Sequence, residues 1–190
     1  MATTQYYTAT SIDGFIADPG NSLDWLFEVG SGGDAGNVRF GPFMAGVGAM
    51  AMGATTYEWV LNHERLLEDP SSWQKYYGAV PCWVFTHRDL PAVPGATLAF
   101  TQADVRDVHQ QMTAAAGGRN IWLVGGGDLA GQFADEGLLD EILLSVAPVT
   151  LGAGAPLLPR RLLSSQLTLT GVDRDDYFAY LSYRVTHHPA

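Results

Sequence analysis

Apolar residues along this chain occur in short runs that are separated by turns rich in glycine and proline. Short runs of β-branched and aromatic residues are typical of strands, whereas apolar residues spaced three or four apart are typical of helices. Two runs near the C-terminus, residues 167–172 and 178–185, predict an antiparallel pair of strands. The other runs that predict strands are residues 5–9, 49–52, 82–86, 97–100, 121–124 and 141–149.

The clearest helix is predicted over residues 101–116, where Val105, Val108 and Met112 fall on one face. Thr101 is expected to cap the start of this helix, because a threonine hydroxyl accepts a hydrogen bond from a first-turn N–H group. The other helices are predicted at residues 37–47, at residues 55–61 behind a threonine cap, and between Gly127 and Gly137.

A long polar loop is predicted between the first strand and the first helix, at residues 11–36. It contains Gly14, Gly20 and four glycines between residues 30 and 36, and residues 23–29 within it could form a turn of helix. Loops of this length are usually either functional lids or disordered. The loop is therefore a candidate cover for a ligand.

Composition and charge support one folded domain, with no linker within residues 1–190. Apolar residues make up 47% of the chain and charged residues 16%, so the chain can fill a core. The net charge of −10 argues against binding to nucleic acid, which needs clustered lysine and arginine. A small-molecule substrate is the expected partner.

Two uncharged stretches, residues 40–57 and 142–159, raise the question of a membrane helix, but glycine and proline interrupt both. The single cysteine, Cys82, lies in a predicted buried strand and excludes an intramolecular disulfide or a cysteine-rich zinc site. No metal site and no membrane partner are expected, and the absence of a secretory pattern favours the cytoplasm.

A turn of three glycines separates the strand at residues 121–124 from the next helix. Glycine lets the backbone approach a ligand closely, and the start of a helix presents unpaired N–H groups to an anion. Residues 125–130 also match the G-x-G-x-x-[GA] dinucleotide fingerprint. The acid expected about 20 residues later is missing, however, which argues against the doubly wound fold. A tight turn without a ligand is the alternative.

Two other strand ends carry residues that suit phosphate. Gly53 precedes Thr55 and Thr56, whose hydroxyls could donate to phosphate or cap the helix. Thr86, His87 and Arg88 follow the strand at residues 82–86 and could bind a phosphate or form a solvated loop. Parallel sheets bind ligands at the carboxyl ends of their strands, so the three strand ends predict one shared crevice.

Four motifs in this order resemble the dihydrofolate reductase-like family, and in particular the branch that contains the reductase domain of bacterial riboflavin biosynthesis. They are the Ser-Ile-Asp-Gly-Phe-Ile-Ala loop at residues 11–17, the Met-Gly-Ala-Thr-Thr-Tyr segment at residues 52–57, the strand end at residues 86–88 and the glycine turn at residues 125–127. The resemblance spans about residues 5–183. It implies a three-layer α/β fold with a mixed, mainly parallel eight-stranded sheet flanked by helices.

The resemblance also implies a nicotinamide cofactor, NADPH, bound across the strand ends. Thr86, His87 and Arg88 would surround the adenosine 2′-phosphate, and Ala9 and Ile16 would border the nicotinamide under the 11–17 loop. The pyrophosphate and ribose would contact the remaining residues, which are Gly53, Thr55, Thr56, Val124, Gly125, Gly126, Gly127, Asp128 and Leu129.

One position departs from the family pattern. Where the family has Gly-Arg-x-Thr, this chain has Gly53 and Ala54, so a charged contact to the cofactor phosphate is missing. Arg88 could compensate. NADH therefore remains a possible cofactor beside NADPH, and equal affinity for the two would refute Arg88 as a 2′-phosphate contact.

The proton donor and the substrate contacts are less well defined. Dihydrofolate reductases use a carboxylate on the first helix, but residues 37–47 contain no acid. Asp13 and Asp24 are the nearest acids and are the catalytic candidates, although Asp13 also suits a turn before a glycine. Ser11, Trp25 and Tyr57 are the candidate substrate contacts, while Trp25 and Tyr57 could instead pack in the core.

Three functions stay open on this reading. The favoured one is an NAD(P)H-dependent reductase of a small planar carbonyl or imine compound, such as a pyrimidine of the riboflavin pathway. The riboflavin enzyme must also hold a ribose phosphate, for which no basic cluster is evident. The alternatives are a pterin or dihydrofolate reductase and a non-catalytic nucleotide-binding protein. The apolar closing strands also predict a homodimer.

Overall fold

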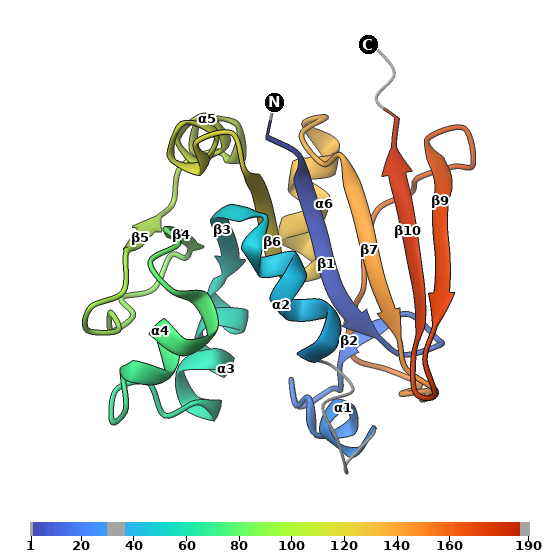
Figure 1. Cartoon of the computed structure of the whole chain (residues 1–190), viewed down its shortest axis with the longest axis horizontal. Helices are drawn as coiled ribbons and strands as arrows, with labels where there is room; N and C mark the ends of the chain where they lie inside the picture. The colour runs from blue at the N-terminus through green and yellow to red at the C-terminus, as the bar shows by residue number, and fades with distance from the viewer. Residues whose placement is uncertain (1, 30–36, 187–190) are drawn as a thin grey trace.

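The computed structural model describes residues 2–29 and 37–186, and its main feature is a mixed sheet of eight strands. Their order across the sheet is β5-β4-β3-β6-β1-β7-β10-β9 (Figure 1). The first six of these run parallel to one another, whereas β10 runs antiparallel to both β7 and β9. The strands are β1 (Thr4–Thr10), β3 (Val47–Gly53), β4 (Cys82–Phe85), β5 (Leu98–Thr101), β6 (Asn120–Gly125), β7 (Glu141–Val146), β9 (Leu167–Arg174) and β10 (Ala179–Val185).

Helices cover both faces of this sheet and complete three layers, which confirms the predicted fold class (Figure 1). α5 and α6 pack on one face, and α2, α3 and α4 pack on the other. None of the helices within residues 2–29 and 37–186 has the length and apolar character that crossing a bilayer requires. The helices are α1 (Asp24–Glu28), α2 (Asn37–Ala45), α3 (Ala54–His63), α4 (Ser71–Tyr77), α5 (Val105–Ala116) and α6 (Gly127–Asp135).

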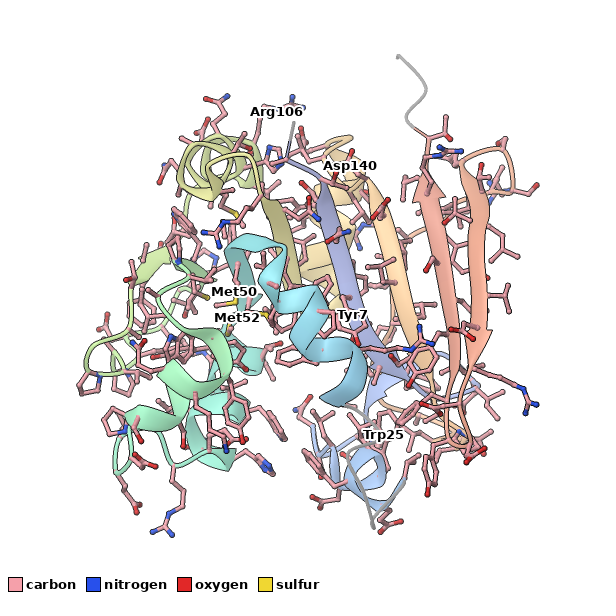
Figure 2. All side chains as sticks on the ribbon, viewed as in Figure 1. Tyr7, Trp25, Met50, Met52, Arg106 and Asp140 are labelled. Atoms are coloured by element: carbon pink, nitrogen blue, oxygen red, sulfur yellow. The ribbon has the colours of Figure 1, made fainter. Side chains whose placement is uncertain are left out.

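Strand β3 contributes to two cores, one on each face of the sheet, because side chains alternate between the faces of a strand. Met50 and Met52 project into the core formed with α2, α3 and α4 (Figure 2), whereas Ala49 and Ala51 face α5 on the other side. Small residues are needed on the α5 side, since a Cβ on Gly48 would lie 2.4 Å from the carbonyl oxygen of Ala116. The sequence of β3 therefore sets how closely α5 approaches the sheet.

The structure corrects two predicted helix caps. Thr101 ends β5, and α5 begins four residues later behind Asp104, whose carboxylate accepts a 2.8 Å hydrogen bond from the Arg106 N–H. Thr55 lies inside α3, which starts at Ala54 behind the N-cap residue Gly53. Both starts were misplaced because a threonine stood near another residue that suits the cap position.

The predicted long loop contains regular structure. Residues Phe15–Ala17 form β2, which pairs with β8 (Ala155–Pro156) in a small second sheet. The predicted helical turn is confirmed as α1, while the glycine-rich residues 30–36 lie outside the described residues. The helix α4 was not predicted.

Replacing the observed cap should destabilise the protein more than replacing the predicted one. We expect Asp104→Ala to lower the free energy of unfolding by about 1 kcal/mol, because the Arg106 N–H loses its acceptor. Asp107→Ala, in the first turn of the same helix, is the control and should cost only about 0.3 kcal/mol. Denaturant unfolding measures both, and a larger effect of Thr101→Ala than of Asp104→Ala would restore threonine as the cap.

Candidate active site

A cleft of about 540 Å³ runs along the carboxyl ends of five parallel strands, β1, β6, β3, β4 and β5. Its volume is within the range of small-molecule sites. The arrowheads of β1 and β7 point to this end of the sheet, where β2 and α1 also lie (Figure 1). The predicted site residues that line the cleft are Ile16, Gly53, Thr55, Thr56, Thr86, His87, Val124, Gly125, Gly126, Gly127, Asp128 and Leu129. The three strand ends therefore share one crevice, as expected.

Two helices begin at the middle of the cleft, and neither start is capped by a side chain. α3 starts behind Gly53 and α6 starts behind Gly126, and both glycines line the cleft. The first N–H groups of a helix have no acceptor within the helix, and they carry a partial positive charge. The cleft thus has two sets of backbone donors at its centre, which suits an anion such as a pyrophosphate.

The glycines of the predicted phosphate turn differ in what they do. A Cβ on Gly127 would lie 2.2 Å from the carbonyl oxygen of Pro156, so glycine at this position allows α6 to pack against β8. A Cβ on Gly126 would have no atom within 4 Å. Gly126 therefore leaves open space beside the helix start, whereas Gly127 serves packing.

One end of the cleft lies over β4 and β5, where Thr86, His87 and Gln102 line it. Thr86 is buried, and its hydroxyl oxygen accepts a 2.9 Å hydrogen bond from the Arg88 N–H. Arg88 was predicted to contact a cofactor phosphate, but it lies outside the cleft lining and forms an ion pair with Glu58. None of the described residues that line the cleft is a lysine or an arginine.

The other end of the cleft lies under the 11–17 loop, where Thr8, Ile16 and Ala17 line it. Ala9 was predicted here but packs in the Trp25 cluster on the other side of β1. Neighbouring residues of a strand point to opposite faces, so Thr8 takes the place expected of Ala9. The alternation of β1 could have identified Thr8 from the sequence.

Three aromatic rings lie at this end of the cleft and connect α1 with α3. The Trp59 and His63 ring centroids are 4.4 Å apart, and those of Phe27 and His63 are 4.8 Å apart. The planes of each pair lie within 15° of parallel. Trp59 also lines the cleft, so an indole forms part of its wall. Sequence reasoning missed Trp59, although its four-residue spacing from His63 was a signal.

The three predicted substrate contacts are buried outside the cleft lining, and for Trp25 and Tyr57 the structure shows the alternative of packing in the core. Tyr57 is in the core, and its hydroxyl donates a 2.7 Å hydrogen bond to the Pro91 carbonyl. Trp25 packs with Ala147 and Phe178 below α2 (Figure 2). The Ser11 hydroxyl donates a 2.6 Å hydrogen bond to Asp13. Each side chain fixes the scaffold that surrounds the site.

The two predicted catalytic acids also lie outside the cleft lining. Asp24 is exposed at the first residue of α1. Asp13 accepts hydrogen bonds from the Ser11 hydroxyl and from the N–H groups of Gly152 (2.7 Å) and Leu151 (3.1 Å). These donors hold the pKa of the Asp13 carboxyl below its usual value. Asp13 therefore anchors the loop to the segment after β7 as an ionised carboxylate.

Asp128 is the one carboxylate among the described residues that line the cleft. Hydrogen bonds from Gln132 (2.9 Å) and from Arg160 (3.1 Å) lower the pKa of Asp128. The same Arg160 guanidinium also pairs with Asp135 at 2.6 Å. Asp128 is therefore ionised and partnered at neutral pH, which is unsuitable for a proton donor.

Comparison with known proteins identifies the family of this chain. The family model of the RibD C-terminal domain matches residues 2–177. The chain belongs to this family. It is also 30% identical over 186 residues to the uncharacterized protein YwjB of Bacillus subtilis, and the match covers 95% of this chain and 96% of that protein.

Solved structures of the RibD and dihydrofolate reductase groups have the same fold. The crystal structure of a putative riboflavin biosynthesis protein from Shewanella sp. PV-4 superposes with a TM-score of 0.73 at 26% identity, covering 98% of this chain and 100% of the other. Dihydrofolate reductase from Enterococcus faecalis, solved with NADP(H), gives a TM-score of 0.58 at 14% identity over 97% of both chains. The predicted resemblance is thereby confirmed.

The anchoring role of Asp13 predicts a pH-dependent loss of stability. We expect Asp13→Asn to lower the melting temperature at pH 7, because the loop loses its charged acceptor. A carboxyl with a lowered folded-state pKa stabilises above its unfolded pKa, and this contribution is lost as the pH falls through the folded value. The difference from the unmodified protein should therefore shrink below about pH 4. Thermal unfolding across this pH range measures it.

Asp24→Asn is the control, since its carboxylate is exposed at the start of a short helix. It should leave the melting temperature nearly unchanged both at pH 7 and below about pH 4. Equal melting temperatures of Asp13→Asn and the unmodified protein at pH 7 would contradict the anchoring role.

Proposed function

We propose that this protein is a reductase that uses a nicotinamide dinucleotide to deliver hydride to a small, planar carbonyl or imine compound. The observation that carries the proposal is the meeting of two uncapped helix starts at the centre of one cleft, beside the open space at Gly126. Membership of the RibD C-terminal domain family supports the same reaction class.

In the proposed arrangement, the dinucleotide lies along the cleft with its pyrophosphate at the centre. The first-turn N–H groups of α6 and α3 would bind the pyrophosphate at the centre. The adenosine half would extend toward His87 and Gln102, and the nicotinamide toward Thr8 and Ile16. When bound, the nicotinamide supplies the hydride, and the protein supplies orientation and exclusion of water.

The substrate end of the cleft favours an uncharged ring. Trp59 offers an aromatic wall, and Thr8 and Asn21 offer hydrogen-bonding groups beside it. No cation among the described cleft residues is placed to hold the ribose phosphate of a riboflavin precursor. We therefore propose a pyrimidine-like carbonyl or imine substrate without a phosphate. Because Asp128 is ionised and the other described lining residues include no carboxyl group, water is the proposed source of the proton.

A second candidate function follows from the same observation about acids. A protein that binds a nucleotide without turning over a substrate needs the phosphate donors but no proton donor. Oxidation of reduced nicotinamide, followed by its absorbance across a panel of carbonyl, pterin and pyrimidine compounds, separates the two. Turnover of one compound supports the reductase, whereas tight dinucleotide binding with no turnover supports the second function.

The open space at Gly126 gives a test of the binding mode. We expect Gly126→Ala to weaken dinucleotide binding by about tenfold, because its Cβ would enter the space next to the helix start. Gly41→Ala is the matched control: Gly41 is also free of neighbours within 4 Å but lies in α2, away from the cleft. Calorimetric titration measures both variants, and an unchanged affinity of Gly126→Ala would contradict the placement.

We also propose that the protein forms a homodimer through the edge of the sheet. The edge strand β9 exposes 52% of Leu169 and 67% of Val172. Apolar side chains on an open strand edge favour pairing with another chain. Light scattering after size exclusion should give twice the mass of the chain, and a monomeric mass would contradict the proposal.

A further inference from the structure

Arg88, which follows Thr86 and His87 at the adenosine end of the cleft, forms an ion pair with Glu58. The Nη1 atom of Arg88 donates to Oε1 of Glu58 at 3.0 Å, and Nη2 lies 2.7 Å from Oε2. This two-point geometry is the stronger form of an arginine–carboxylate pair. Both η nitrogens of Arg88 therefore contact the Glu58 carboxylate.

The positions of the two residues are fixed by separate elements. Glu58 belongs to α3, whose first turn lines the cleft, and it lies one turn after Ala54. The backbone of Arg88 is held by the Thr86 hydroxyl, which accepts from the Arg88 N–H and donates to the Arg88 carbonyl. If the guanidinium turned toward a phosphate, the Glu58 carboxylate would remain close by and would repel it.

No lysine or arginine among the described residues lines the adenosine end of the cleft. The polar residues that line this end are Thr86, His87, Thr101 and Gln102. Arg160, near the centre of the cleft, is engaged by Asp128 and Asp135. A phosphate ester at the adenosine ribose would therefore meet hydroxyl, amide and imidazole groups beside a neutralised ion pair.

We propose that Glu58 sets the cofactor preference: by neutralising Arg88 it removes recognition of the 2′-phosphate, so that the protein binds NADH at least as tightly as NADPH. This inference rests on the proposed dinucleotide site and names Glu58 as its specificity-determining residue. Glu58 acts through Arg88 and does not itself line the cleft.

The test is a calorimetric titration of NADH and NADPH into the purified protein at a mildly alkaline pH, where imidazole side chains carry little charge. The unmodified protein should bind NADH with a dissociation constant equal to or below that for NADPH. Glu58→Gln should tighten NADPH binding by about fivefold, because a freed Arg88 can pair with the 2′-phosphate at a partly exposed site. NADH affinity should change by less than about twofold.

Two further variants make the result specific. Glu58→Gln combined with Arg88→Gln should lose the gain for NADPH, because the cation itself is then absent. Glu68→Gln is the matched control, since it removes the partner of Arg65 in a similar exposed ion pair that does not line the cleft. It should leave both affinities unchanged, although it alters the net charge by the same amount.

The outcomes distinguish this inference from the proposed function. If neither dinucleotide binds, the proposed function fails and the inference fails with it. A different outcome is that both dinucleotides bind, that the unmodified protein prefers NADPH by more than about tenfold, and that Arg88→Gln abolishes this preference. The dinucleotide site is then supported, and the role of Glu58 is overturned. An unchanged NADPH affinity in Glu58→Gln would overturn it as well.

Discussion

The centre of the cleft is formed by the N–H groups at the starts of α3 and α6, and no side chain caps either start. Each helix follows directly from a strand in the middle of the sheet, β3 or β6, and each has glycine as its N-cap residue. A capping side chain would satisfy some of these N–H groups, as Asp104 does at the start of α5. Because Gly53 and Gly126 have no side chain, the donors of both helices are left to a ligand in the shared crevice.

The elements around this centre hold it in place. Gly127 lets α6 pack against the backbone of Pro156 and Leu157 in and after β8, and β8 pairs with β2 of the N-terminal loop. Asp13 ties the same loop to the N–H groups of residues 151 and 152. The 11–17 loop at one end of the cleft is therefore connected to the start of α6 at its centre.

Much of the fold and of the cleft could be predicted from the sequence because the signals were local. The glycine turn at residues 125–127, the threonines after Gly53 and the end of β4 each follow a buried strand, and the rules of parallel sheets bring such ends together. The sequence left two interpretations open for Trp25 and Tyr57, substrate contact or core packing, and both side chains are buried in the core. Their burial depends on residues far along the chain, such as Pro91 and Phe178.

Two further features depend on tertiary contacts that no motif contains. The partner of Arg88 is 30 positions away on another element, so the sequence alone presented the arginine as a free cation. Asp13 stood in an Asp-Gly pair that suits both a turn and a proton relay, and its acceptor role became clear only when residues 151 and 152 were placed beside it. Whether the charge of Arg88 or of Asp13 is available to a ligand therefore depends on a partner that is distant in the sequence.

The shared role of the two helix starts can be tested by following backbone amide resonances during titration with ADP-ribose, which contains the pyrophosphate but no nicotinamide. If both helix starts bind the pyrophosphate, the largest shifts occur together at the N–H groups of residues 126–129 and 54–56. Shifts confined to one helix start, or centred on residues outside the cleft, would contradict it.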